Sequence, residues 1–487
     1  MFGDYVYEQS AANWDHKLLI EDYSGIGFAA SCTDVFQRNG FHIIPYSDDL
    51  SFRLNSYEEL LDQDKKIVVL LEERKYVPYD VSRRLHCYQL SFEKLFPKLN
   101  GDALRDQISL DLDLLSEAYA KNYEDQRSKT RTEEFLRNKV YIAENAVNVV
   151  RESYAQLLSL AKHGCTYKGW MKIAEEKARI DILSCRYQLG FDSSELNRLF
   201  ETFVIRDFGK LSGEIDRHTP VLVSKAMDYM STKSKKFALV VMDGMSEFDW
   251  DILSESFEGI HYSRSAAMAM APTITSVSRQ CLVAGKYPRE LINPWKQEKE
   301  KQEFTQCAKN LGYADQQIQY GRGYDFEPET FSKCCCVIIN DCDDMVHGQK
   351  QGMPGMYQDM KLLAGQGKLA ELTRRLIRKG FDVYISADHG NTECIGAGLL
   401  KGTGVETETK SHRMIVLKDY ANQEQLKEKY SLIEFPKYYL NKELNYLICE
   451  CGESLDAKGV RVMSHGGITL DEVVVPFIEI MAGKNNG

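Results

Sequence analysis

The chain has 487 residues, of which 43% are hydrophobic, so it is long enough for several domains with buried cores. A formal net charge of −11 argues against a broad basic surface that wraps nucleic acid, although bound metals could create a local cationic cleft. The thirteen cysteines include no Cys-x-x-Cys pair and indicate neither a disulfide framework nor a thiolate zinc site. Without a signal-like N-terminus or an apolar run of about 18 residues, we expect a cytoplasmic protein that does not contact membranes.

The first hundred residues alternate short apolar runs with stretches that can form helices. The runs Lys17–Ile20, Phe41–Ile44 and Ile67–Leu71 are typical of strands. We therefore predict a small α/β domain over residues 1–100.

The next part of the chain favours helices. No proline occurs between Pro97 and Pro220, and residues 102–189 are rich in leucine, glutamate, lysine and arginine, with only two glycines. Apolar residues such as Leu110, Leu114 and Ala118 recur at the spacing of a helix face. This pattern predicts a helical domain or connector over residues 101–230.

From Lys235 onward, strand-like runs again alternate with helical ones. Such alternation is typical of an α/β domain in which helices flank a parallel sheet on both faces. We predict this domain over residues 231–487, with its ligands near the carboxyl ends of the strands.

Acidic side chains and histidines follow three apolar runs of this third domain. Asp243 ends the run Lys-Phe-Ala-Leu-Val-Val-Met, and Asp388 and His389 follow Phe-Asp-Val-Tyr-Ile-Ser-Ala. Asp343 and His347 follow the run Val-Ile-Ile-Asn-Asp-Cys, and their four-residue spacing places them on one face of a helical turn.

Two further acids and one further histidine belong to the same pattern. Asp341 and Asp344 compete with Asp343 for its role, and His465 lies in Ser-His-Gly-Gly. Glycine follows each of the three histidines, which allows sharp turns and leaves room for an ion and an anionic substrate. Two-metal phosphoryl transfer requires oxygen and imidazole ligands from several sides, so this region predicts an enzyme.

Hydroxyl side chains cluster where Pro272 indicates the start of a helix. Thr273, Thr275 and Ser276 could cap that helix, and the same geometry could serve catalysis, because a helix N-terminus favours both an alkoxide and a phosphoryl group. Arg279, one turn after Thr275, could reach the same phosphate.

The ordered set of motifs resembles the alkaline phosphatase superfamily, and more closely its PglZ branch, known from BREX-type phage-defence systems and some bacterial signalling proteins. The resemblance covers roughly residues 235–480. Besides the acids and histidines above, it depends on Pro-Thr-Ile-Thr-Ser-Val-Ser-Arg at 272–279 and on Ser-His-Gly-Gly-Ile-Thr-Leu-Asp-Glu-Val-Val-Val-Pro at 464–476. The segment Phe-Glu-Lys-Leu-Phe-Pro at 92–97 is also similar to the leading region of BREX-associated members.

The resemblance implies an alkaline-phosphatase-like fold and a two-ion site. In members that use a threonine, two aspartates, a histidine and the nucleophile hold one ion, and an aspartate and two histidines hold the other. Carried over to this chain, the first set is Asp243, Thr275, Asp388 and His389, and the second is Asp343, His347 and His465. Thr275 would be the nucleophile, with Arg279 as a second catalytic residue.

The implied chemistry is phosphoryl transfer. Two divalent ions about 4 Å apart would lower the pKa of the threonine hydroxyl and neutralise the transferring group, and water would then release the covalent intermediate. Histidine and aspartate ligands without thiolates favour zinc, with manganese second. The Cys/Ser-x-Pro-x-Arg motif of sulfatases and the Asn-Ser-Glu-x-Gly-His motif of cofactor-independent phosphoglycerate mutases are absent. A phosphodiesterase or a phosphatase remains.

We expect this hydrolase to act on a phosphate ester, by analogy a nucleotide or nucleic acid, in phage defence or bacterial signalling, with other defence-system proteins as partners. One alternative is a catalytically silent scaffold in a defence complex. Another is that residues 1–230 bind a partner or nucleotide that gates the hydrolase.

Overall fold

Four short parallel strands form the first sheet of this computed structural model, in the order β2-β3-β1-β4. They are β1 (Lys17–Glu21), β2 (Phe41–Pro45), β3 (Lys66–Leu71) and β4 (His86–Gln89). The first three coincide with the strands expected from the sequence. The fourth was not expected, because its side chains are mostly exposed and produce no apolar run.

Helices precede, connect and follow these strands. They are α1 (Phe2–Gln9), α2 (Phe28–Ser31), α3 (Thr33–Arg38), α4 (Asp49–Asn55), α5 (Tyr57–Leu61), α6 (Tyr79–Ser82), α7 (Phe92–Leu95), α8 (Gly101–Arg105), α9 (Leu112–Ala120), α10 (Lys129–Phe135) and the π-helix η1 (Leu136–Val140). Side chains from β1, β2 and β3 pack with Phe52 of α4 and Leu60 of α5 in one apolar core.

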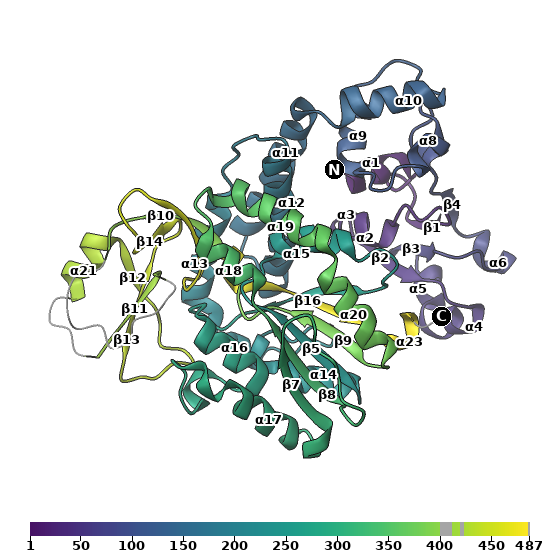
Figure 1. Cartoon of the computed structure of the whole chain (residues 1–487). Helices are drawn as coiled ribbons and strands as arrows, with labels where there is room; N and C mark the ends of the chain where they lie inside the picture. The colour runs from purple at the N-terminus through teal and green to yellow at the C-terminus, as the bar shows by residue number, and fades with distance from the viewer. Residues whose placement is uncertain (400–411, 419–422, 486–487) are drawn as a thin grey trace. The chain divides into compact units, whose positions relative to one another are not determined.

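The chain separates into two compact units, Met1–Ser153 and Tyr154–Gly487. The structure describes residues 1–399, 412–418 and 423–485 (Figure 1). Within those residues, no helix is both long and apolar enough to cross a membrane.

Helices form the first part of the second unit, as the sequence predicts. They are α11 (Ala143–Lys162), which begins in the first unit, α12 (Tyr167–Arg186), α13 (Ser194–Asp207), the 3-10 helices η2 (Phe208–Gly213) and η3 (Val223–Lys225), and α14 (Ala226–Lys233). One face of α12 is buried, including Trp170, Ile173 and Ile180, which confirms the expected helical packing.

A six-stranded sheet forms the core of the second unit, in the order β6-β16-β9-β5-β8-β7. Its strands are β5 (Phe237–Met242), β6 (Ser263–Met268), β7 (Ile318–Arg322), β8 (Cys334–Ile339), β9 (Asp382–Ser386) and β16 (Val474–Ile480). The strands β9, β5, β8 and β7 are mutually parallel, whereas β16 is antiparallel to both of its neighbours. Every residue of β5 and β8 is buried, which explains their continuous apolar sequences.

Helices cover this sheet on both faces. Figure 1 shows α16 and α17 on one side and α19 and α20 on the other. The helices between the strands are α15 (Glu247–Leu253), η4 (Ser254–Ser256), α16 (Thr275–Ala284), η5 (Pro288–Glu290), η6 (Gln297–Lys299), α17 (Glu300–Asn310), η7 (Asp315–Gln317), α18 (Asp341–Gly348), α19 (Gly352–Gln366) and α20 (Lys368–Arg378). The predicted α/β class with a flanked, mainly parallel sheet is therefore confirmed.

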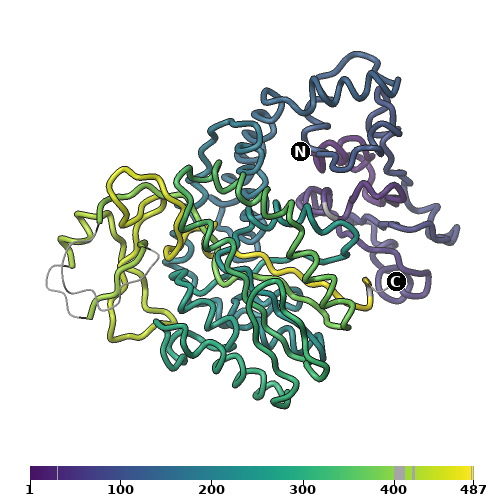
Figure 2. The backbone as a smooth tube through the Cα atoms, in the orientation of Figure 1, coloured from purple at the N-terminus to yellow at the C-terminus, as the bar shows by residue number. Residues whose placement is uncertain are grey.

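Two small three-stranded sheets lie between β9 and β16 in the sequence, in the orders β14-β10-β15 and β11-β13-β12. Their elements are β10 (Thr392–Gly396), β11 (Met414–Leu417), α21 (Gln423–Tyr430), β12 (Leu432–Glu434), β13 (Asn445–Cys449), β14 (Glu453–Ser454) and β15 (Arg461–Ser464). Figure 2 shows the yellow C-terminal backbone leaving these sheets and entering the large sheet. The chain closes with α22 (Leu470–Val473), β16 and α23 (Ala482–Asn485).

Candidate metal centre

The carboxyl ends of neighbouring strands bring the predicted residues together. Asp243 follows β5, α18 with Asp343 follows β8, and Asp388 with His389 follows β9. Thr275 is the first residue of α16, after β6. In parallel strands these ends meet at one edge of the sheet, as the sequence pattern predicts.

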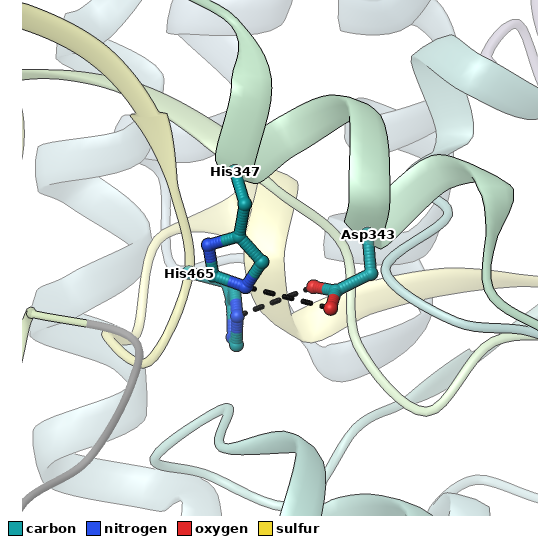
Figure 3. A group of neighbouring side chains, drawn as sticks. All are labelled: Asp343, His347 and His465. Atoms are coloured by element: carbon teal, nitrogen blue, oxygen red, sulfur yellow. Dashed lines mark ion pairs between the residues drawn. The ribbon is translucent and has the colours of Figure 1, made fainter.

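His465 reaches the same place by another route. It follows β15, a strand of a small sheet that pairs antiparallel with β10, and lies just before α22. Figure 3 shows His465 from this segment, with Asp343 and His347 from α18, facing one another. Asp343 contacts both histidine Nε2 atoms, each at 3.4 Å. One ligand atom from each of the three residues lies within 4.8 Å of the others, which makes them a candidate metal-binding group.

A second candidate group consists of Asp243, Asp388 and His389, again with ligand atoms within 4.8 Å. All three residues are buried. The Nε2 atom of His389 lies 3.7 Å from a carboxylate oxygen of each aspartate. It also lies 2.9 Å from Oγ1 of Thr275, so the threonine hydroxyl is at the edge of this group.

The two groups are adjacent. The rings of His389 and His465 stack with their centroids 4.1 Å apart and an interplanar angle of 10°. The geometry therefore brings together all seven residues that the resemblance assigns to two ions.

Four buried atoms in these groups have no hydrogen-bond partner among the described residues. They are Asp243 Oδ1, Asp343 Oδ1, Asp388 Oδ2 and His465 Nε2. Leaving such atoms unsatisfied costs roughly 1–3 kcal/mol each, more when they are charged. Because all four are lone-pair donors of the kind that bind zinc or manganese, the residues fit a pair of divalent ions.

The two buried histidines are held in the form that a metal ligand requires. Nδ1 of His389 lies 2.9 Å from the carbonyl oxygen of Gly390, and Nδ1 of His465 lies 3.0 Å from that of Thr273. Because a carbonyl oxygen only accepts, each Nδ1 carries a proton, and in the neutral form of each ring Nε2 has the lone pair that a metal requires.

Burial determines the charges of these groups. Burial, followed by the neighbouring His389, lowers the pKa of His465 to about 3, so its imidazole is neutral. Burial raises the pKa values of Asp388 and Asp243, and a neighbouring carboxylate adds to each shift, that of Asp243 at Asp388 and that of Asp343 at Asp243. At Asp343, burial opposes ionisation, but the hydrogen bond with His347 and the nearby histidines outweigh it and hold its pKa below the usual range.

Arg279 lies behind the carboxylates. Its side chain is 1% exposed, forms an ion pair with Asp243, and donates from Nε to Glu300 at 2.8 Å. A third carboxylate, that of Asp388, lies 4.0 Å away. The structure thus surrounds the guanidinium with acids, whereas the sequence pattern suggested that it reaches a phosphate.

Thr273 has a role that the sequence did not suggest. Helix α16 has no side-chain cap, so none of the three hydroxyl residues caps it as expected. Instead, the Thr273 hydroxyl donates to the carbonyl of Gly467 at 2.9 Å and accepts from the amide of Gly466 at 3.0 Å. Thr273 therefore fastens the segment before the helix to the segment that carries His465.

Glu472 makes further contacts with this segment. The sequence reasoning did not single it out, and its place in the motif at 464–476 was the only signal that could have identified it. Its carboxylate is fully buried and accepts from the amides of Gly467 at 2.8 Å and Thr469 at 3.0 Å. The guanidinium of Arg413, also fully buried, lies 3.6 Å away. These contacts fix the backbone that follows His465, next to Thr273, whose hydroxyl lies 3.5 Å from the Glu472 carboxylate.

The glycines after the histidines differ in what they contribute. Gly466 has a φ of 102°, a backbone conformation that other residues rarely adopt. At Gly390, an added Cβ would lie 2.0 Å from the carbonyl oxygen of Asp471. Gly348 has neither constraint, so the expected requirement for glycine holds at two of the three positions.

The competing acids of α18 lie outside both groups. The candidate group includes Asp343 but neither Asp341 nor Asp344, and Asp344 is exposed. The helix turns these neighbours away from His465 because successive residues point about 100° apart.

One family model and several solved structures are similar to part of this chain. A family model described as the BREX system PglZ alkaline phosphatase-like domain matches residues 221–480. No curated protein matches the chain. Among solved structures, murine ectonucleotide pyrophosphatase/phosphodiesterase 5 is similar at 12% identity and a TM-score of 0.37, covering 50% of this chain and 88% of that one. A phosphonoacetate hydrolase from Sinorhizobium meliloti 1021, in complex with phosphonoacetate, is similar at 10% identity and a TM-score of 0.32, covering 50% and 90%.

Proposed function

The chain belongs to the PglZ family of alkaline phosphatase-like domains from BREX systems, and from this premise we propose that it is a two-metal hydrolase of phosphodiester bonds. The observation that carries this proposal is the set of four unsatisfied ligand atoms in two adjacent Asp/His groups. Zinc is the proposed metal and manganese the second choice, because the ligands are imidazoles and carboxylates. The proposed setting is phage defence.

Two bound ions would neutralise the phosphoryl group in transfer and lower the pKa of a hydroxyl beside them. Asp243, Asp388 and His389, with Thr275, would hold one ion. Asp343, His347 and His465 would hold the other.

Thr275 is the proposed nucleophile. Its Oγ1 lies at the first residue of α16, where free backbone amides and the helix dipole favour an anionic phosphoryl group. No side-chain cap occupies this helix end, which leaves its amides for substrate. Attack by Oγ1 would form a phosphothreonine as the bond from phosphorus to the leaving oxygen breaks, and water would then hydrolyse the phosphothreonine.

The substrate is proposed to be a nucleotide or nucleic acid diester rather than a simple phosphate monoester. A panel of aryl phosphates, aryl phosphodiesters, cyclic nucleotides and oligonucleotides, each with added zinc or manganese, tests this preference. Faster turnover of aryl monoesters than of every diester would contradict it.

Substitution of the two key residues tests the mechanism. We expect Thr275→Ala to abolish turnover while the protein keeps its fold and most of its metal, and His465→Ala to lose one of up to two ions per chain. Ser276→Ala, one residue away, is the matched control and should stay active. Elemental analysis and the substrate panel provide the readouts.

Three outcomes would contradict the proposal or a part of it. A protein without transition metal after incubation with excess zinc would remove the metal assignment. Full activity of Thr275→Ala would remove the nucleophile. A metal-loaded wild type that cleaves nothing in the panel would favour the silent scaffold instead.

A further inference from the structure

A cavity of about 540 Å³ lies apart from the residues of the candidate metal centre. The segment that follows α16 contributes Pro288, Leu291 and Trp295 to its lining, the segment leading into β13 contributes Leu440, and β13 contributes Tyr446. The volume is within the usual range for small-molecule sites. Nothing in the proposed chemistry uses this cavity.

Two aromatic side chains, those of Trp295 and Tyr446, form one wall of the cavity. The rings of Trp295 and Tyr446 stack with their centroids 6.3 Å apart and an interplanar angle of 28°. Tyr446 is fully buried, and its hydroxyl donates to the carbonyl of Asn441 at 3.1 Å, so it supports the half-buried indole rigidly. A supported indole beside an open cavity suits a planar heteroaromatic ring, because nucleobases stack on such surfaces regardless of their sequence.

Two cations accompany this wall. Arg289 and Lys442 line the cavity together with one acid, Glu443. Among the described residues, the Arg289 guanidinium has no hydrogen-bond or ion-pair partner. Lys442 is held in place because its Nζ donates to the carbonyls of Lys437 at 2.6 Å and Tyr438 at 3.2 Å. The lining thus offers an aromatic surface and an unpaired guanidinium, which together match a planar base attached to a phosphate.

A glutamine connects the cavity to the helix of the proposed nucleophile. Nε2 of Gln280, a fully buried residue of α16, donates to the carbonyls of Asn293 at 3.1 Å and Pro294 at 3.4 Å. Gln280 is five residues after Thr275, about 7.5 Å along the helix. Gln280 therefore connects the segment that carries Pro294 and Trp295 to the helix that begins at Thr275.

We propose that this cavity binds a nucleotide, with its base stacked on Trp295 and its phosphate facing Arg289 and Lys442. The consequence for catalysis rests on the proposed function. The cavity would bind one nucleotide of the substrate and so direct the enzyme to nucleic acid or nucleotide substrates.

Equilibrium binding to the full-length, metal-stripped protein tests the cavity without the reaction. We expect AMP to bind without metal, and ribose 5-phosphate, which lacks the base, to bind about tenfold more weakly. Trp295→Ala should weaken AMP binding by a similar factor, whereas Trp295→Phe should retain most of it. Trp14→Ala, at a tryptophan that is 77% exposed in the first unit, is the matched control and should bind AMP as the wild type does.

The Arg289→Gln variant separates the phosphate contact from the base contact. It should weaken the binding of AMP and leave that of adenosine unchanged. The proposal is wrong if AMP binding disappears when the metals are removed, or if it is unaffected by Trp295→Ala.

A kinetic comparison separates this proposal from the proposed function. With metal restored, Trp295→Ala should raise KM for a dinucleotide about tenfold and leave hydrolysis of methyl 4-nitrophenyl phosphate unchanged. If the wild type cleaves no diester, the proposed function fails, and the AMP binding measurements still test whether the cavity binds a nucleotide. If the wild type cleaves both diesters and Trp295→Ala slows them equally, the cavity proposal alone fails.

Discussion

In each aspartate of the second candidate group, one carboxylate oxygen contacts other groups of the protein and the other oxygen has no hydrogen-bond partner among the described residues. Oδ1 of Asp388 accepts from the amides of Gly244 at 3.2 Å and His389 at 3.1 Å, and Oδ2 of Asp243 contacts Arg279. The other oxygen of each aspartate is unsatisfied among the described residues. Arg279 is then the nearest permanent positive charge for two buried carboxylates, from which we infer a structural role for it.

Replacing Arg279 with glutamine should therefore lower stability more than it alters substrate affinity. Removing the cation leaves the buried Asp243 without its ion-pair partner and leaves Glu300 only the half-exposed Arg322, at an expected cost of about 3–5 kcal/mol in the metal-free protein. Zinc should restore part of that loss, because bound ions supply positive charge. Thermal unfolding with and without zinc measures both effects.

Arg322→Gln is the matched control for this prediction. Arg322 also contacts Glu300, at 3.3 Å, but its side chain is 49% exposed, so we expect a cost below about 1 kcal/mol. If Arg279→Gln is equally mild and instead raises KM for substrate, the contact with phosphate expected from the sequence is correct.

A buried carboxylate on α13 makes stability depend on pH. Glu201 is 9% exposed, and Oε1 has no hydrogen-bond partner among the described residues. Burial raises its pKa to about 7, although Arg413 opposes the shift. The folded protein therefore holds the proton more tightly than the unfolded chain, so this residue favours folding at low pH, and that contribution is lost as pH rises toward 7.

We expect Glu201→Gln to be more stable than the wild type at pH 8, by at most about 3 kcal/mol, and nearly equal to it at pH 4.5. Unfolding by urea at the two pH values measures the difference. Glu195→Gln, at a residue of the same helix whose side chain is 44% exposed, should show no such dependence. A Glu201→Gln variant that is less stable at pH 8 would mean that the ionised carboxylate stabilises the fold.

At the scale of elements, α12 and α13 hold the segment that carries His465. Nζ of Lys177, in α12, donates to Asp181 at 2.7 Å and to both carboxylate oxygens of Asp471 at 2.8 Å. Nδ2 of Asn197, in α13, donates to the same Asp471 at 2.8 Å. Because Asp471 lies in α22, shortly after His465, this network connects two helices far away in the sequence to the candidate metal centre.

Lys177→Met should break this connection. The side chain is 2% exposed, so losing its charge leaves the buried Asp181 and the half-buried Asp471 without a cation and should cost about 3–5 kcal/mol. We expect the variant to lose the ion of the Asp343, His347 and His465 group before that of the other group, as measured by metal content during stepwise chelation.

Lys168→Met provides the control in the same helix. Lys168 pairs with Asp216 at 2.7 Å, but its side chain is 61% exposed, so we expect little change in stability or metal content. Simultaneous loss of both ions from Lys177→Met would show that the network supports the whole unit rather than His465.

At the scale of the whole molecule, the family match and the compact units differ in extent. The match begins at residue 221, whereas the second unit begins at Tyr154. Residues before 221 make specific contacts in this unit, since the Tyr439 hydroxyl donates to the carbonyls of Phe208 at 3.1 Å and Gly209 at 3.0 Å. The domain boundaries after residues 100 and 230 remain a proposal that fragments can test.

We predict that a fragment from Ala143 to the C-terminus folds cooperatively and binds the same number of metal ions as the full chain. It retains every element of the second unit. A fragment that begins at Pro220 lacks Lys177 and the partners of Tyr439, so it should unfold at a lower temperature or aggregate. Calorimetry and elemental analysis compare the two, and equal stability and metal content would support the boundary near residue 230.

The sequence by itself determined the class of the fold and the order of the ligand motifs. Strands such as β5 and β8 are buried on both faces, so they appear as continuous apolar runs, and the acids that follow them are identified by position alone. The spacing of Asp343 and His347 is equally local, because one helical turn relates them. The exposed strand β4 has no such signal and was missed.

Only the tertiary structure decided which groups surround each ligand. Thr273 and Gly466 are 193 residues apart in the chain, and Lys177 and Asp471 are 294 apart, yet each pair forms hydrogen bonds. No local periodicity encodes such contacts, because they depend on how whole elements pack. The same reason explains why the partners of Arg279 and the route of His465 through a small antiparallel sheet could not be predicted from the sequence.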